Sequence, residues 1–205
     1  MKLKSILMRT GMVAVFFYTL HIIIGGILWK DYSQLYQPIS DLTSAGAPNR
    51  NLLLIFTTTY SIFALIFALS FSILASKHQN KFILWGGICY IIMHCISVSY
   101  GFFPEDLPNQ QQTFSGTMHI VVTALIVPFT ILSPLLIGIG FRKENKWKSL
   151  GTVSIITGIL IIIFGGATAI FYANKLSYFG LVERLNIGVL QLWTFYFSYK
   201  LVTTK

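Results

Sequence analysis

Three histidines lie in long apolar stretches of this chain, where an ionisable side chain needs a physical reason to be present. His21 and His94 lie well inside two such stretches, and His119 lies near the start of a third. An ionisable group surrounded by hydrocarbon costs energy unless it has a partner or water, so these positions are candidate functional residues. Imidazole can ligate zinc, ligate haem iron, or bind a ligand and titrate near neutral pH.

Carboxylates lie in the polar segments between apolar stretches, within QPISDLTSAGAPNR, FFPEDLPN and GLVERL. Only 10% of the residues are charged, so acidic groups in these three segments need a separate explanation. If the segments meet at one end of a helical bundle, their side chains and the histidines form one polar site. The candidate ligand-binding residues are Ser40, Asp41, Asp106, Glu183 and Arg184.

The composition places the chain in a membrane. With 205 residues, 55% of them hydrophobic, the chain cannot bury its apolar surface in a soluble globule of this size. A membrane-spanning helix needs about 20 mostly apolar residues. We therefore predict an all-α membrane protein, a single domain over residues 1–205 with six transmembrane helices in one bundle. The predicted spans are approximately 11–29, 52–75, 82–103, 117–140, 150–172 and 181–199.

The last span poses a problem of length, because its charge-free part, residues 185–199, is too short to cross a bilayer unaided. The helix must therefore begin near Gly180, which places Glu183 and Arg184 at the membrane boundary. Neighbouring residues on a helix point about 100° apart. We therefore do not expect these two side chains to pair with each other.

The basic residues predict the orientation. The net charge is +9, with 15 Lys and Arg, but only Lys30, Arg50, Lys175 and Arg184 lie in segments on one side of the predicted spans. The others, from Lys2 at the start to Lys205 at the end, lie on the opposite side. The positive-inside rule then predicts cytoplasmic N- and C-termini. Basicity is here a topology signal, so membrane lipids are the expected partners, nucleic acid is not, and no oligomeric state is implied.

A family resemblance follows from the polar motifs. The segments QPISDLTSAGAPN, GFFPEDLPN with GTMH after it, and GLVERL resemble the bacterial integral membrane family called domain of unknown function nine-ninety-eight. The resemblance implies a six-span plan and supplies no activity. A more distant similarity is to the eukaryotic DRAM and GPI-remodelling group of membrane proteins. The family motifs fall on Ser40, Asp41, Asp106, His119, Glu183 and Arg184.

Three functions fit these residues. We favour an outward-facing polar site, closed by the segment 37–50, that binds a lipid headgroup or small polar ligand in a sensor, binder or transporter. The first alternative is a metal-dependent hydrolase of a lipid or another membrane-borne substrate at the outer leaflet, with His119 and Asp106 as zinc ligands and His94 or His21 completing the set. The second is haem b held between His21 and His94.

A purely structural alternative applies to the segment 37–50. Ser40 and Asp41 would then only cap the loop and tie it to Arg184 or to a helix end.

Overall fold

The computed structural model describes residues 2–107 and 110–204, is 80% helical and has no strand in the described part. The predicted inner charge Lys205 lies outside the described residues. The six α-helices are α1 (Lys2–Leu28), α2 (Arg50–Ser76), α3 (Lys81–Ser97), α4 (Phe114–Arg142), α5 (Lys148–Ala173) and α6 (Phe179–Thr203). Three short 3-10 helices are η1 (Ser40–Thr43), η2 (Val98–Gly101) and η3 (Asn145–Trp147).

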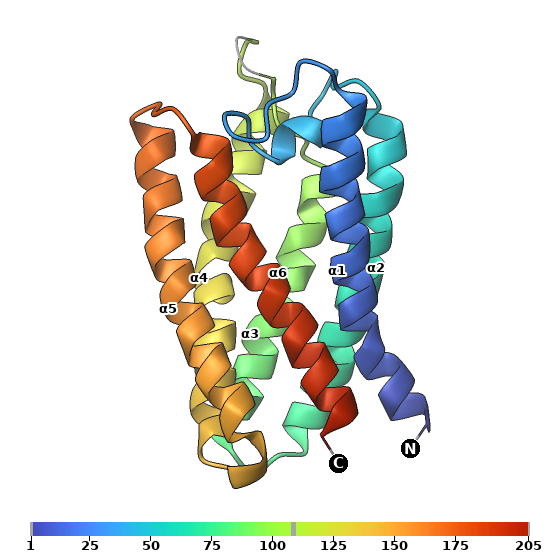
Figure 1. Ribbon diagram of the computed structural model, residues 1–205, viewed down its shortest axis with the longest axis vertical. Helices are drawn as coiled ribbons and strands as arrows, with labels where there is room; N and C mark the ends of the chain where they lie inside the picture. Colours follow the sequence, from blue (N-terminus) through green and yellow to red (C-terminus); the bar gives the residue numbers. More distant parts are fainter. Residues whose placement is uncertain (1, 108–109, 205) are drawn as a thin grey trace.

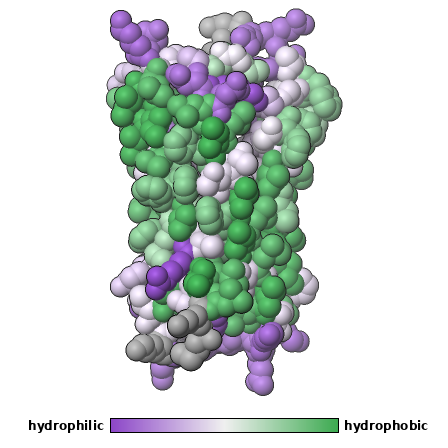
Figure 2. Space-filling model, turned by 90° about the vertical axis from the view of Figure 1, so that its right-hand side faces the viewer, coloured by the Kyte–Doolittle hydropathy of each residue, from purple (hydrophilic) through white to green (hydrophobic). Residues whose placement is uncertain are grey.

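The helices suit a membrane. Five of them, α1 to α5, are long and apolar enough to cross a bilayer. The sixth, α6, has 25 residues and begins at Phe179, so its length of about 37 Å is sufficient, although it carries charged residues near both ends. The face shown in Figure 2 has a broad hydrophobic band between hydrophilic ends. The predicted six-helix membrane fold is therefore confirmed.

The helices form a closed ring. Each helix packs against the next one in the chain, and α6 returns to pack against α1 (Figure 1). Both termini lie at the same end of the bundle, called here the terminal end, and the α1–α2 loop (residues 29–49) lies at the opposite end, called here the loop end. The centre of a ring of this kind must be filled by side chains from several helices.

Large aromatic side chains fill the centre toward the terminal end. Trp193 and Phe197 of α6 stack with ring centroids 5.1 Å apart, and Phe197 packs edge-on against Phe71 of α2 at 4.6 Å. Phe67 and Tyr90 complete this aromatic plug, and all five rings are almost fully buried. The plug therefore forms the aromatic part of the core on that side.

Glycines bring neighbouring helices close together. A Cβ atom at Gly86 of α3 would lie 2.6 Å from the side chain of Ile137 of α4, and one at Gly138 would lie 2.8 Å from the backbone of Ile155 of α5. Small residues at such contacts allow the close helix approach that replaces the hydrophobic effect as a packing force in lipid. These contacts fix the α3–α4–α5 side of the ring.

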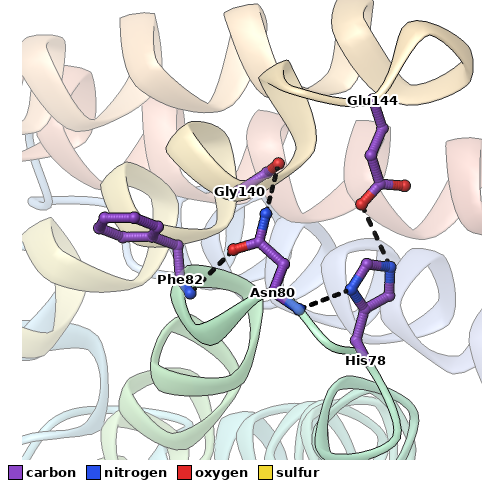
Figure 3. Close-up of polar contacts among 5 residues, drawn as sticks. All are labelled: His78, Asn80, Phe82, Gly140 and Glu144. Carbon is purple, nitrogen blue, oxygen red and sulfur yellow. Dashed lines mark hydrogen bonds and ion pairs between the residues drawn. The ribbon is translucent and has the colours of Figure 1, made fainter.

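At the terminal end, polar contacts join the α2–α3 connection to the end of α4 and to the α4–α5 connection (Figure 3). Asn80 caps α3 by accepting the backbone N–H of Phe82 at 3.0 Å, and its side-chain amide donates to the carbonyl of Gly140 at 3.1 Å. His78 Nε2 lies 3.2 Å from Glu144 Oε1. These contacts hold the connections together at the terminal end, and none of them involves a residue of the loop end.

Candidate functional site

The α1–α2 loop is tied to the first turns of α6 by Arg184. The guanidinium donates from Nε to Gln34 Oε1 at 2.7 Å, from Nη1 to the carbonyl of Gln37 at 2.8 Å, and from Nη2 to the hydroxyl of Tyr32. Its neighbour Glu183 accepts the backbone N–H of Ile39 at 2.6 Å. Glu183 and Arg184 thus bind the loop separately, as their divergence on the helix predicts.

Asp41 is buried inside this loop. Its carboxylate is 1% exposed and accepts a hydrogen bond from the side-chain amide of Gln37 at 3.3 Å. Burial, and then the negative charge of Glu105, raise the pKa of Asp41 to about 6, while Gln37 and Arg184 oppose the rise. Ser40 begins η1 and is half-buried, and its carbonyl accepts the Thr43 hydroxyl at 3.5 Å.

Asp106 and His119 organise the start of α4. The Asp106 carboxylate accepts both the backbone N–H and the hydroxyl of Thr113, at 2.7 and 2.8 Å, and Thr113 in turn caps the helix by accepting the N–H of Gly116. His119 donates from Nδ1 to the carbonyl of Phe103 at 2.8 Å. These contacts give both side chains a structural role.

At the loop end, the α1–α2 loop contacts the connection between α3 and α4. The backbone N–H of Ala45 donates to the carbonyl of Glu105 at 3.0 Å, and Ala45 pairs with Asp106 in an isolated bridge. Oε2 of Glu105 is buried and has no hydrogen-bond partner. This contact brings the carboxylate of Glu105 close to that of Asp41.

A cluster of polar side chains, called here the polar cluster, lies inside the ring beneath the α1–α2 loop. It consists of Tyr18 and His21 of α1, Tyr60 of α2, His94 of α3 and Gln191 of α6. The ring centroids of Tyr18 and Tyr60 are 4.9 Å apart, those of Tyr18 and His21 are 5.9 Å apart, and those of Tyr60 and His94 are 6.5 Å apart. The Gln191 amide donates to the Tyr60 hydroxyl at 3.1 Å. Four helices therefore bring polar side chains to one place.

Several atoms of the polar cluster have unused hydrogen-bonding capacity. His21 and His94 are 2% and 3% exposed, and both ring nitrogens of His21 and Nε2 of His94 have no partner. The side-chain oxygen of Gln191 is also buried and has no hydrogen-bond partner. In native proteins, each buried polar atom without a partner calls for an explanation. The cluster therefore has unused donor and acceptor capacity in a buried place.

The candidate metal ligands divide between two places. His21 and His94 belong to the polar cluster, whereas Asp106 and His119 lie at the start of α4 and are engaged by their own neighbours. Across residues 2–107 and 110–204, no group of three His, Cys, Asp or Glu side chains is arranged to hold a metal ion. For haem b, the two imidazoles would need an open space between them, but the rings of Tyr18 and Tyr60 connect them instead.

Sequence reasoning missed Tyr60 and Gln191 of the polar cluster. Both are polar residues within apolar stretches, so a search for every hydrogen-bonding residue in the spans would have found them. Gln34 and Gln37 were missed for a different reason. Their contacts with Arg184 join residues about 150 positions apart, and local sequence carries no signal for such contacts.

Comparison with known proteins identified a family. A family model described as "Protein of unknown function (DUF998)" matches residues 12–199, which is most of the chain. No significant match was found among curated proteins or among solved structures.

Proposed function

Because the chain belongs to the DUF998 family, whose description names no activity, we propose its function from its own residues: it is a multi-pass membrane protein that binds a small polar ligand in the polar cluster beneath the α1–α2 loop. The protein would act as a binder, a sensor or one stage of a transporter. We place it in the bacterial inner membrane with cytoplasmic termini, on the distribution of its basic residues.

One observation carries this proposal, namely the unpartnered atoms of His21, His94 and Gln191 inside the ring. Leaving a buried donor or acceptor without a partner costs about 1–3 kcal/mol. A chain selected for stability alone would fill this place with apolar side chains, as it does with the aromatic plug. A ligand that supplies the missing hydrogen bonds explains why polar residues are placed here.

The spacing of α1 and α6 differs between the two ends of the bundle. Near the terminal end these helices are in close contact, because a Cβ atom at Gly11 would lie 2.8 Å from Ser198 and the N–H of Met12 donates to the Ser198 hydroxyl at 3.2 Å. They diverge toward the loop end (Figure 1), where Gln34 joins them by donating to the carbonyl of Ile22 and accepting from Arg184. We propose that a ligand enters from the outer side, where the loop bridges these two helices and its displacement would remove the bridge.

The test compares molecules that remain bound to the purified protein. Wild type, Gln191→Leu and the matched control Gln111→Leu, which makes the same change in an exposed loop, are purified in mild detergent, and their small molecules are released by denaturation and identified by mass spectrometry. We expect a polar molecule enriched in the wild type and in Gln111→Leu and lost in Gln191→Leu. Identical profiles from all three proteins would refute the proposal.

A further inference from the structure

The charges near the polar cluster are unbalanced. Three carboxylates, those of Asp41, Glu105 and Glu183, lie near the guanidinium of Arg184, and a second guanidinium, that of Arg50, donates to the carbonyl of Thr43 at 3.1 Å. The negative charges of Glu105 and Asp41 both act on Glu183, and Glu105 also acts on Asp41. Glu183 lies eight residues before Gln191 on α6, which is about 12 Å along the axis and about 80° around it. The carboxylates therefore lie between the outer side and the polar cluster.

Arg184 does not neutralise these carboxylates by pairing with them. All of its hydrogen bonds go to uncharged oxygens, which belong to Gln34, Gln37, Gly180 and Tyr32. Across the part of the chain that the structure describes, the ion pair is that of His78 and Glu144 at the terminal end. The negative charge at the loop end is thus available to an incoming group.

The carboxylates also have hydrogen-bonding capacity left. Glu183 accepts a backbone N–H through one oxygen, Asp41 accepts one side-chain amide, and Oε2 of Glu105 is buried with no partner. An ionised carboxylate offers about four lone-pair sites, whereas an ammonium group offers three donors and no acceptor. Electrostatic repulsion among the three acids and their unused acceptors are both relieved by a cation with N–H donors.

The polar cluster below also offers unpartnered acceptors, next to the one N–H donor of the His21 ring. The side-chain oxygen of Gln191 is an acceptor, and a neutral imidazole offers one acceptor nitrogen. The rings of Tyr18 and Tyr60 add aromatic faces, which attract cations. An anion or a carboxylate ligand would meet repulsion from the acids before it reached these groups.

We propose that the ligand is a small organic cation carrying an ammonium group, which Asp41, Glu105 and Glu183 attract and whose N–H groups the buried acceptors bind. This inference rests on the proposed function, because it names the chemical class of the ligand for the same site. It adds a role for the acidic residues of the loop end that hydrogen bonding within the loop does not require.

The test uses the full-length protein in dodecyl maltoside at pH 7.5, with thermal unfolding followed by tryptophan fluorescence. The probes are ammonium chloride and ethanolamine as cations with N–H donors, choline as a cation without them, ethylene glycol as the neutral counterpart of ethanolamine, and glycolate as the anionic one. Sodium chloride is added to equal ionic strength throughout. A ligand that binds only the folded protein raises Tm in a saturable way. We expect this rise with ethanolamine and not with ethylene glycol, glycolate or sodium chloride.

Two variants locate the charge. Glu183→Gln keeps an oxygen that can accept the N–H of Ile39 and removes the charge, so we expect the Kd for ethanolamine to rise about tenfold. Asp31→Asn makes the equivalent change in charge at an exposed position of the same loop, and we expect a change within about twofold. Equal effects of the two variants would overturn the inference.

The outcomes separate this inference from the proposed function. If glycolate or ethylene glycol stabilises the protein and Gln191→Leu abolishes the effect, the site exists and its assignment to cations is wrong. If none of the three cations stabilises the wild type, the inference is overturned regardless of which molecule co-purifies. If ethanolamine binds equally well to Gln191→Leu, the polar cluster is not the site and both proposals fail.

Discussion

Replacing His94 by phenylalanine tests whether the polar cluster is kept for a ligand at the expense of stability. His94 is 3% exposed, its Nε2 has no partner, and its ring packs edge-on against Tyr90 with centroids 4.7 Å apart. A phenyl ring has a similar shape and can keep this aromatic contact. The substitution therefore removes a buried polar atom without removing the packing.

The expected effect is a gain in stability. A buried polar atom without a partner costs about 1–3 kcal/mol, and the larger ring offsets part of the gain through crowding. We expect His94→Phe to raise the free energy of unfolding by about 1 kcal/mol. For a chain of this length, that corresponds to a rise in Tm of about 2–4 °C.

The assay is thermal unfolding in detergent, followed by tryptophan fluorescence, with Ser154→Ala as the control. The Ser154 hydroxyl accepts the indole N–H of Trp193 at 2.8 Å, so its removal leaves a buried donor without a partner. We expect this control to lower the free energy of unfolding by about 1 kcal/mol. If His94→Phe is destabilised as much as Ser154→Ala, the imidazole serves the fold, and the reasoning behind the proposed site is refuted.

Three further results are expected. Arg184→Met removes the side chain that holds the α1–α2 loop, so amide hydrogen exchange in residues 31–48 should increase while exchange in α4 and α5 stays unchanged. Because burial and Glu105 raise the pKa of Asp41 to about 6, the folded protein binds this proton more tightly than the unfolded chain does. The contribution of Asp41 to stability is thus fully present below about pH 4 and is lost as the pH rises to about 6. Unfolding measured between pH 4 and 7 should show a smaller loss of stability in Asp41→Asn than in the wild type. Thr113→Val removes the cap of α4 and should lower the free energy of unfolding by about 1 kcal/mol, measured by thermal unfolding, whereas an unchanged value would contradict the capping role.

The sequence predicts the helices because each of them is a long apolar run, and hydropathy depends on local composition alone. The start of α6 near Gly180 follows from the length that a bilayer requires, and the structure begins this helix at Phe179. The partners of the polar residues are harder to predict. Asp106 was a candidate ligand, yet it contacts Thr113 only seven residues away, and Arg184 contacts Gln34 across 150 residues. The first pairing depends on the local path of the α3–α4 connection and the second on how the ring closes, and hydropathy describes neither.

Arg184 binds the α1–α2 loop through uncharged partners, and this helps to explain which residues the loop contains. A loop that only had to be fixed to α6 could use a carboxylate to pair with the guanidinium, because charge-assisted pairs are the stronger contacts. This loop uses the side-chain oxygen of Gln34, a backbone carbonyl and the hydroxyl of Tyr32 instead. Its buried acid, Asp41, accepts its hydrogen bond from the neutral amide of Gln37. Arg184 thus holds the loop through uncharged acceptors, and the carboxylates are left without an ion-pair partner, which is the arrangement that a cation-binding site needs.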